Sequence, residues 1–232
     1  ETSHMFRAEK HNTSRHLNEY MSMDFEMGFI DSYEDIMNME EGYIKSMITR
    51  LEKNCSKEFE LLGAKLPKIP KKIPRLKLSE VQNILEKEYK EKCSGAPDLE
   101  PKHEKQICEF VEKKFDSEFI FVTHYPTKKR PFYTHEDPQD PEHTLSFDLL
   151  FRGLEMTTGG QRLHLYDDYI KRMRERKMDP AGFEDYLSIF RYGMPPHGGL
   201  AIGMERLTSL LLGLENVREG CLFPRDINRL RP

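Results

Sequence analysis

Apolar and polar side chains alternate from Tyr20 onward with the period of two that is typical of a β-strand. One face, which we expect to pack on a core, carries only large apolar groups: Met21, Met23, Phe25, Met27 and Phe29. The opposite face carries a ring and polar groups: Tyr20, Ser22, Asp24 and Glu26. Residues 5–9 predict a partner strand, and the polar run 10–18 predicts the loop of a long hairpin.

A second pattern, near the other end, is a glycine-flanked apolar strand at 198–203 that leads directly into a helix. Arg206 falls in the first turn of this helix, where the macrodipole disfavours a cation by roughly 0.3–1 kcal/mol. A cation there indicates an anion in front of it, and the glycines leave room for a ligand against the backbone. An arginine that reaches solvent or a surface carboxylate would fit the same pattern.

The residues between these blocks predict helices separated by short strands. The expected helices cover residues 31–51, 79–92, 102–115, 163–177 and 180–192. An extended, proline-punctuated connector is expected at 65–75, and strands at 118–123 and 155–162. This order predicts a mixed α+β fold with a mainly antiparallel sheet flanked by helices.

Composition narrows the class of protein. A chain of 232 residues is long enough for one domain with a substantial core, and none of its apolar runs approaches the ~18 residues of a membrane span. The four cysteines show no paired spacing, which indicates free thiols in a reducing compartment. The net charge is −4, so any nucleic-acid contact has to come from a local patch. We therefore expect a cytoplasmic enzyme without a membrane partner.

The polar face of the hairpin suits a nucleotide and an amino group. An arginine matches a phosphate, an aromatic ring matches a purine, and carboxylates match an ammonium or exocyclic amine. These groups would be Arg7, Glu9, Tyr20 and Asp24 if they share one face. The alternative is an exposed antiparallel sheet with cross-strand ion pairs.

Taken together, the two blocks resemble motifs 2 and 3 of the class II aminoacyl-tRNA synthetases. Residues 7–19, 151–155, 159–162 and 222–226 are similar to the aspartyl-tRNA synthetases of the archaeal and eukaryotic type. The resemblance places motif 2 at 5–30, a helical insertion-like region at about 62–115 and motif 3 at 197–213. It implies the C-terminal part of a catalytic domain, without motif 1 and the anticodon-binding domain.

The resemblance assigns ATP-binding roles to one set of residues. Arg7 would bind the α-phosphate, Glu9 the adenine amino group and Arg206 the γ-phosphate. Arg7 and Arg206 are thus the expected catalytic residues. Tyr20 takes the position of an adenine-stacking phenylalanine. The remaining expected ATP-binding residues are His16, Glu155 and Gly203.

A second set is assigned to aspartate and to magnesium. Asp24 would bind the amino group of the amino acid, and Arg162 its side-chain carboxylate. Arg130 and Thr158 complete the expected aspartate site, and Asp148 with Glu155 would hold Mg²⁺ on the phosphates. Each of these residues, taken alone, would also fit an ordinary capped or ion-paired position in a fold.

The implied function is ATP-dependent activation of L-aspartate to aspartyl-adenylate, followed by transfer to the 3′ end of tRNA. Lys10, His11 and Arg15 of the hairpin loop would contact the tRNA acceptor end, and the parent enzyme would be a homodimer. Three alternatives stay open. They are an asparaginyl-tRNA synthetase, a tRNA-independent asparagine synthetase-like relative, and a non-catalytic fragment or paralogue.

Overall fold

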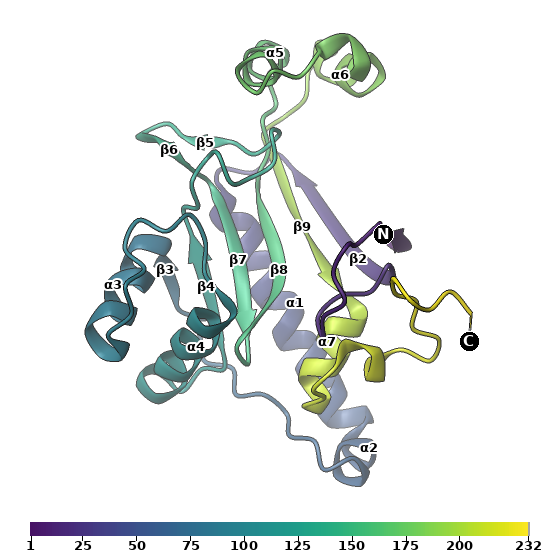
Figure 1. The fold of residues 1–232 in the computed structure, drawn as a ribbon. Helices are drawn as coiled ribbons and strands as arrows, with labels where there is room; N and C mark the ends of the chain where they lie inside the picture. Colours follow the sequence, from purple (N-terminus) through teal and green to yellow (C-terminus); the bar gives the residue numbers. More distant parts are fainter. Residues whose placement is uncertain (232) are drawn as a thin grey trace.

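A seven-stranded sheet organises the computed structural model, which describes residues 1–231 (Figure 1). The strand order is β1-β2-β9-β8-β7-β4-β3, and every pair is antiparallel except β3 with β4. Its strands are β1 (Thr2–Phe6), β2 (Glu19–Gly28), β3 (Arg75–Lys77), β4 (Phe119–Thr123), β7 (Ser146–Phe151), β8 (Leu154–Gln161) and β9 (His197–Gly203). A separate hairpin joins β5 (Glu136–Asp137) to β6 (Asp140–Thr144). The predicted mixed α+β, mainly antiparallel architecture is confirmed.

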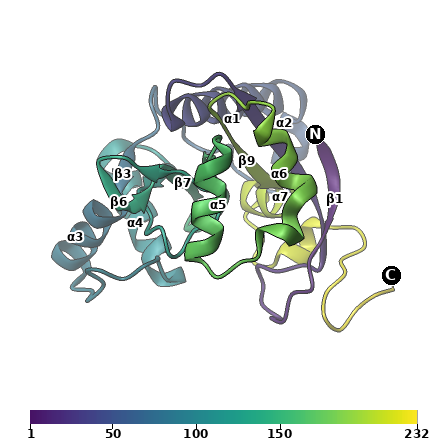
Figure 2. The ribbon, with the colours of Figure 1, turned by 90° about the horizontal axis from the view of Figure 1, so that it is seen from above.

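Helices cover the two faces of the sheet unequally, as the view from above shows (Figure 2). The helices are α1 (Tyr33–Asn54), α2 (Ser56–Leu61), α3 (Leu78–Tyr89), α4 (Pro101–Phe115), α5 (Tyr166–Glu175), α6 (Glu184–Arg191) and α7 (Met204–Leu212). Short 3₁₀ turns lie at Pro180–Phe183 and Val217–Gly220. α1 packs along one face and α3 with α4 on the other, over β4 and β7. The second face is therefore left free of these helices above β2 and β9.

Local sequence explains where several of these elements begin and turn. Ser32 caps α1, and the Asp35 carboxylate accepts back from the Ser32 amide, which completes a capping box. The β7–β8 hairpin turns at Arg152 and Gly153. Both residues have positive φ, which is what a two-residue type I′ turn requires. A side chain at Gly153 would also collide with α4, since a Cβ there would lie 2.8 Å from Lys105 Cγ.

The N-terminal hairpin differs from its prediction in two respects. The first strand is Thr2–Phe6 rather than 5–9, so Arg7 and Glu9 lie just after it, in the loop. Phe29 is not in the core: its φ is 60° and 88% of its surface is exposed, because the chain has already left the sheet. Met23, Phe25 and Met27 do pack against the core beside α1, as expected.

The region between α1 and β4 contributes more than helices. α3 and α4 each begin one residue before their predicted start. They share a core with β4. The connector before them also supplies β3, a parallel edge strand that the sequence analysis did not predict.

Along the chain that the structure describes, no helix has the length and apolar character needed to cross a membrane.

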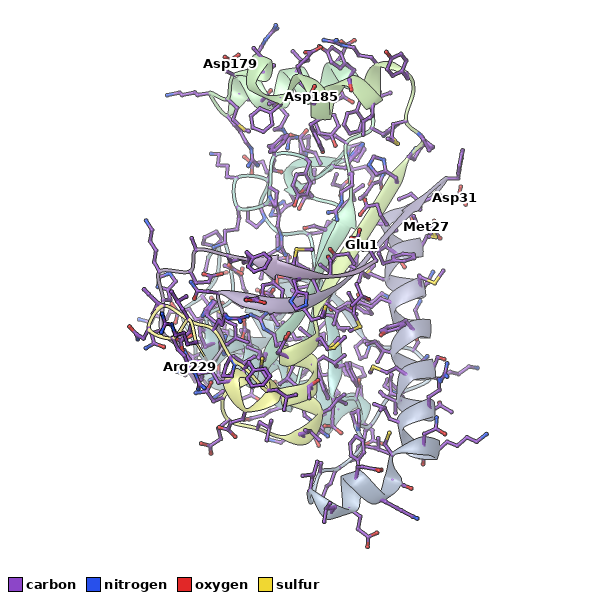
Figure 3. All side chains as sticks on the ribbon, turned by 90° about the vertical axis from the view of Figure 1, so that its right-hand side faces the viewer. Glu1, Met27, Asp31, Asp179, Asp185 and Arg229 are labelled. Carbon is purple, nitrogen blue, oxygen red and sulfur yellow. The ribbon has the colours of Figure 1, made fainter. Side chains whose placement is uncertain are left out.

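The opposite edge of the sheet carries both ends of the described chain. Seen edge-on, β2 has α1 and Asp31 on one side, and the C-terminal segment around Arg229 on the other (Figure 3). Arg225 of that segment pairs with Glu19 at the start of β2, at 2.6 Å. The C-terminal segment therefore contacts the end of the hairpin loop.

Candidate active site

A cavity of about 340 Å³ opens on the sheet face opposite α1, above β2, β8 and β9. Residues far apart in the sequence line it together, and those predicted as site residues are Arg7, Glu9, His16, Tyr20, Glu155, Thr158, Gly203 and Arg206. The other predicted residues, Asp24, Arg130, Asp148 and Arg162, do not belong to its wall. The cavity therefore joins the predicted nucleotide residues more completely than the predicted aspartate residues.

The register of four neighbouring strands explains the floor of this region. Asp24 on β2 lies opposite Ala201 on β9, and Ala201 lies opposite Thr158 on β8. Thr158 in turn lies opposite Asp148 on β7. Paired residues of adjacent strands point to the same side of a sheet, so these four form one row across it. The small, exposed Ala201 leaves the middle of the row open.

The hairpin loop brings an arginine and a ring together at one side of the cavity. The Arg7 amide donates to the Asn18 carbonyl at 2.8 Å and closes the loop. The Arg7 guanidinium lies 5.4 Å from the centre of the Tyr20 ring and is 64% exposed, so it is available to an anion. The Glu9 carboxylate stands 4.0 Å from it and is the nearest negative charge.

Arg206 enters the cavity from the first turn of α7. Its Nη1 donates to the Glu155 carbonyl at 2.8 Å and lies 3.8 Å from the Glu155 carboxylate. Its Nη2 reaches the Arg15 carbonyl of the hairpin loop at 3.5 Å. Arg206 thus faces an internal carboxylate and is oriented by two backbone carbonyls rather than reaching solvent.

The glycines around β9 do not act alike. A Cβ at Gly203 would have its nearest neighbour at 3.8 Å, so this position does leave space beside Arg206 and Tyr20. The expectation is wrong for Gly198 and Gly199, where neighbouring strands take the space. A Cβ at Gly198 would lie 2.6 Å from the Gly160 carbonyl oxygen, and one at Gly199 would lie 2.0 Å from Glu26 Oε2.

Glu155 lines the cavity, and Asp148, outside its wall, is close enough for its charge to act on the Glu155 carboxyl. Burial, and then the charge of Asp148, raise the pKa of Glu155 to about 7. The side chain of Glu155 nevertheless keeps 38% of its surface accessible and accepts from the Thr158 hydroxyl at 3.0 Å. Asp148 is buried, and its Oδ1 has no hydrogen-bond partner among the described residues.

These acids fit a divalent cation. Mg²⁺ in nucleotide sites is usually held by one or two carboxylates together with substrate phosphates, so a third protein acid is not needed. Among residues 1–231 no group of three His, Cys, Asp or Glu side chains has a geometry suited to a metal ion. An unpartnered carboxylate oxygen beside a second acid with a raised pKa is a site that a cation would neutralise.

Arg130 lies beneath the cavity rather than in it. Its Nη2 is 2.8 Å from Asp148 Oδ2, and its guanidinium lies 3.8 Å from the centre of the Tyr125 ring. Both partners of this ion pair are largely buried, with side-chain exposures of 11% and 4%. Arg130 therefore compensates the buried charge of Asp148, a role that the sequence did not predict.

The two remaining aspartate-site residues have side-chain partners of their own. Asp24 Oδ1 accepts from the Ser22 hydroxyl at 2.6 Å. Arg162 donates through Nε and Nη2 to the two carboxylate oxygens of Glu26, at 3.1 and 3.4 Å. Gly199 beneath makes room for that carboxylate, and the Tyr133 ring lies 5.2 Å from the guanidinium. The Arg162 fork is thus already set for a carboxylate.

The hairpin loop presents a divided surface. Lys10 and His11 are exposed, whereas Arg15 is partly buried and pairs with Glu104 of α4 at 3.0 Å. His16 Nδ1 lies 2.6 Å from the Thr13 hydroxyl, and burial lowers the His16 pKa. Of the three residues predicted to contact tRNA, Arg15 alone already has an acidic partner.

Two polar residues that line the cavity, Ser22 and Glu205, had no role in the sequence-based prediction. Ser22 was assigned to the correct face of β2 but to no role. Both carboxylate oxygens of Glu205 accept a hydrogen bond from the Met21 amide, at 3.0 Å each, and this contact joins α7 to β2. Arg15, which was predicted to contact tRNA, also lines the cavity and pairs with Glu104. Of Ser22 and Glu205, only Ser22 carried a signal in the sequence, its place in the alternating pattern.

Comparison with known proteins identifies the family to which this chain is similar. The family model described as tRNA synthetases class II (D, K and N) matches residues 1–227. The aspartate–tRNA(Asp/Asn) ligase of Thermus thermophilus is 48% identical over 235 residues, covering 100% of this chain and 54% of that protein. The chain thus spans about half the length of the curated relatives it matches.

Solved structures agree in fold. An aspartyl tRNA synthetase from Entamoeba histolytica matches with a TM-score of 0.93 and 34% identity, covering 100% of this chain and 48% of that one. An asparaginyl-tRNA synthetase from Pyrococcus horikoshii, complexed with asparaginyl-adenylate, matches with a TM-score of 0.91 and 35% identity, covering 100% and 53%. The family match extends over nearly the whole chain, and the chain belongs to the class II tRNA synthetases of the D, K and N type.

Proposed function

We propose that the protein containing this chain is an aspartate–tRNA ligase. It would activate L-aspartate with ATP to aspartyl-adenylate, release pyrophosphate and transfer the aspartyl group to the 3′ end of tRNA. The observation that carries the proposal is the convergence of Arg7, Arg206 and the Tyr20 ring on one cavity beside the Asp148–Glu155 acids. The names of the curated relatives, which are aspartate–tRNA ligases, support the same substrate.

The nucleotide would lie between the hairpin loop and α7. The Tyr20 ring offers a face to adenine, and Glu9 offers an acceptor to its amino group. Arg7 would bind the α-phosphate and Arg206 the γ-phosphate, because these guanidinium groups enter the cavity from the loop and from α7. Gly203 and His16 would complete the ATP contacts.

Activation needs no general base, because the attacking group is already a carboxylate anion. An oxygen of the aspartate α-carboxylate forms a bond to the α-phosphorus, and the bond from that phosphorus to the bridging oxygen breaks as pyrophosphate leaves. Arg7 and Arg206 would neutralise the charge that develops on the phosphates, as fixed cations in a partly enclosed site. In the second step, the terminal ribose hydroxyl of tRNA takes the aspartyl group and AMP leaves.

Asp148 and Glu155 would hold Mg²⁺, and the ion would supply additional positive charge to the phosphates of ATP. Thr158 orients the Glu155 carboxylate by donating to its Oε1. Arg130 compensates the charge of the buried Asp148 carboxylate, since the two side chains form a direct ion pair.

Aspartate would bind at the other end of the row across the sheet. Asp24 would accept its amino group, and Arg162 would hold its side-chain carboxylate in the fork that Glu26 occupies in this structure. The likeness to a solved asparaginyl-tRNA synthetase keeps asparagine as the second candidate substrate. A fork that already pairs with a carboxylate favours aspartate, because an amide would place a donor against the guanidinium.

The acceptor end of tRNA would approach the hairpin loop, where Lys10 and His11 are exposed. We also infer a homodimer and a cytoplasmic location for the whole protein, as the resemblance implied. Arg15 is the third loop residue assigned to tRNA, and its pair with Glu104 would have to open for direct contact.

Aspartate-dependent exchange between ATP and pyrophosphate tests the proposal. The full-length protein should catalyse it with aspartate and Mg²⁺, should fall to background without the ion, and should be far slower with asparagine. Formation of free asparagine from aspartate and ammonia would instead favour the asparagine synthetase-like alternative. Absence of exchange with both amino acids would contradict the proposal.

A further inference from the structure

One buried acid of α4 reaches across to the hairpin loop of the nucleotide site. The Glu104 side chain is 10% exposed, and Oε2 accepts from Arg15 Nη1 at 3.0 Å. The two residues are 89 positions apart in the sequence. The pair therefore joins the α3–α4 unit, which holds none of the residues assigned to the site, to the loop that carries Arg7, Glu9 and His16.

Glu104 is an exception on the buried face of α4. Apolar groups dominate that face, where Ile107, Cys108 and Val111 pack against β4 and β7. Burial raises the pKa of the Glu104 carboxyl, and the charge and hydrogen bond of Arg15 oppose this effect. A carboxylate in such a place is costly unless it is paired, and Arg15 is its direct partner.

Arg15 links this acid to the cavity. The residue lines the cavity, and its carbonyl oxygen accepts from Arg206 Nη2 at 3.5 Å. The same loop is fixed elsewhere by Arg218, which donates to the Thr13 carbonyl at 3.0 Å. The loop is thus anchored on one side by the C-terminal segment and on the other by α4, and Arg15 is the residue that connects α4 to Arg206.

We propose that Glu104 is a positioning residue for the nucleotide loop: its pair with Arg15 holds the loop in the shape that receives ATP. The inference rests on the proposed function, since it names the ligand of that cavity. Glu104 touches neither the substrate nor the reacting atoms. It acts through Arg15, whose main chain orients Arg206 and whose neighbour His16 lies in the cavity wall.

A direct contact between Arg15 and tRNA would give a different pattern. In that case Arg15→Ala would weaken tRNA binding and leave activation without tRNA unchanged, and Glu104→Gln would have little effect. Positioning predicts that both substitutions weaken ATP binding in the absence of tRNA. It also predicts that the two effects are not additive, because either change breaks the same pair.

The test uses exchange of pyrophosphate into ATP by the full-length protein, with Glu104→Gln, Arg15→Ala and the double variant. We expect each single variant to raise the KM for ATP about fivefold to tenfold, which corresponds to the net contribution of about one hydrogen bond. The KM for aspartate should stay within twofold of the wild-type value. The KM for ATP of the double variant should be no higher than that of the more impaired single variant. Glu109→Gln, at an exposed position of the same helix, is the matched control.

A second readout does not depend on activity. Trypsin should cleave after Lys10 several times faster in Glu104→Gln than in the wild type, because the loop loses one anchor. An unchanged KM for ATP in either single variant, additive effects, or equal losses for both substrates would overturn the proposal. If the wild type lacks exchange altogether, the proposed function fails. ATP binding measured by calorimetry on the same variants then decides the inference, with weaker binding supporting it and equal binding overturning it.

Discussion

The two ends of the candidate site differ in how their charged side chains are partnered. At the nucleotide end, Arg7 is largely exposed and its nearest acid, Glu9, lies 4.0 Å away. At the aspartate end, Arg162 forms a two-point pair with Glu26. Arg7 therefore presents its charge to the cavity, whereas Arg162 is already satisfied by a close partner. Arg206, at the nucleotide end, lies between these cases, 3.8 Å from the Glu155 carboxylate.

This difference indicates how the two substrates would bind. ATP would meet the exposed Arg7, which needs only to exchange water for phosphate, and Arg206, whose contact with the Glu155 carboxylate is long, at 3.8 Å. Aspartate would have to share or replace an internal partner of Arg162, which makes binding depend on the competing acid. The aspartate end can therefore discriminate between a carboxylate and an amide more sharply than the nucleotide end discriminates among nucleotides.

The strongest test of the nucleotide end is loss of Arg206. We expect Arg206→Ala to lower kcat/KM for ATP in the exchange reaction by about 10²-fold to 10³-fold, since one fixed cation is lost from the developing charge. The reaction is followed with labelled pyrophosphate. Arg174→Ala, an exposed arginine of α5, should be unchanged. A loss below threefold for Arg206→Ala would remove this residue from the assigned machinery.

A smaller and more selective effect is expected at the aspartate end. Arg162→Ala should raise the KM for aspartate by about 30-fold to 100-fold with the KM for ATP nearly unchanged, because a charged bidentate contact is worth a few kcal/mol. Arg162→Lys keeps the charge without the fork, and we expect it to recover only part of the loss. Both constants come from the same exchange assay. Equal increases in both would show that Arg162 does not separate the two ends.

The last prediction measures stability rather than activity and concerns β8, the strand that the two ends share. Glu40 of α1 is buried beneath this strand beside Thr157, and neither carboxyl oxygen has a hydrogen bond of standard geometry. Burial raises the Glu40 pKa from 4.5 to about 8, so the folded state holds its proton where the unfolded state has lost it. This contribution to the free energy of unfolding is complete below pH 4.5 and is lost as the pH rises to 8. The loss is at most roughly 1.4 kcal/mol for each pH unit.

Glu40→Gln should remove that dependence. Relative to the wild type, the melting temperature of the variant should rise steadily between pH 5 and pH 8. Glu52→Gln, at an exposed position of the same helix, provides the baseline. A constant difference across this range would mean that Glu40 is already charged in the folded protein.

Features repeated along the chain were predictable from the sequence. The alternation over β2 identified the polar face that carries Tyr20, Ser22 and Asp24, and the step from an apolar run into a helix identified β9 and α7. The end of β1 was misplaced because residues 7–9 were assigned to the strand but belong to the loop. Phe29 looked like a core residue because alternation cannot show where a strand leaves the sheet.

Pairs between distant elements were not predictable. The Arg15–Glu104, Arg162–Glu26 and Arg130–Asp148 pairs depend on how separate elements pack, and the sequence contains no spacing that specifies them. The glycines of β9 show the same limit. The sequence marks them as special, but only their neighbours in the fold decide that Gly199 accommodates Glu26 and that a Cβ at Gly203 would meet ordinary contacts alone.

Calorimetric titration with non-hydrolysable adenylate analogues tests the central claim most directly. The wild-type protein should bind the aspartyl analogue tightly and the asparaginyl analogue at least about 100-fold more weakly, since the Arg162 fork would face a carboxylate in one and an amide in the other. The preference should disappear in Arg162→Ala. Equal affinity for both analogues, or tight binding of the asparaginyl analogue alone, would contradict an aspartate-specific site.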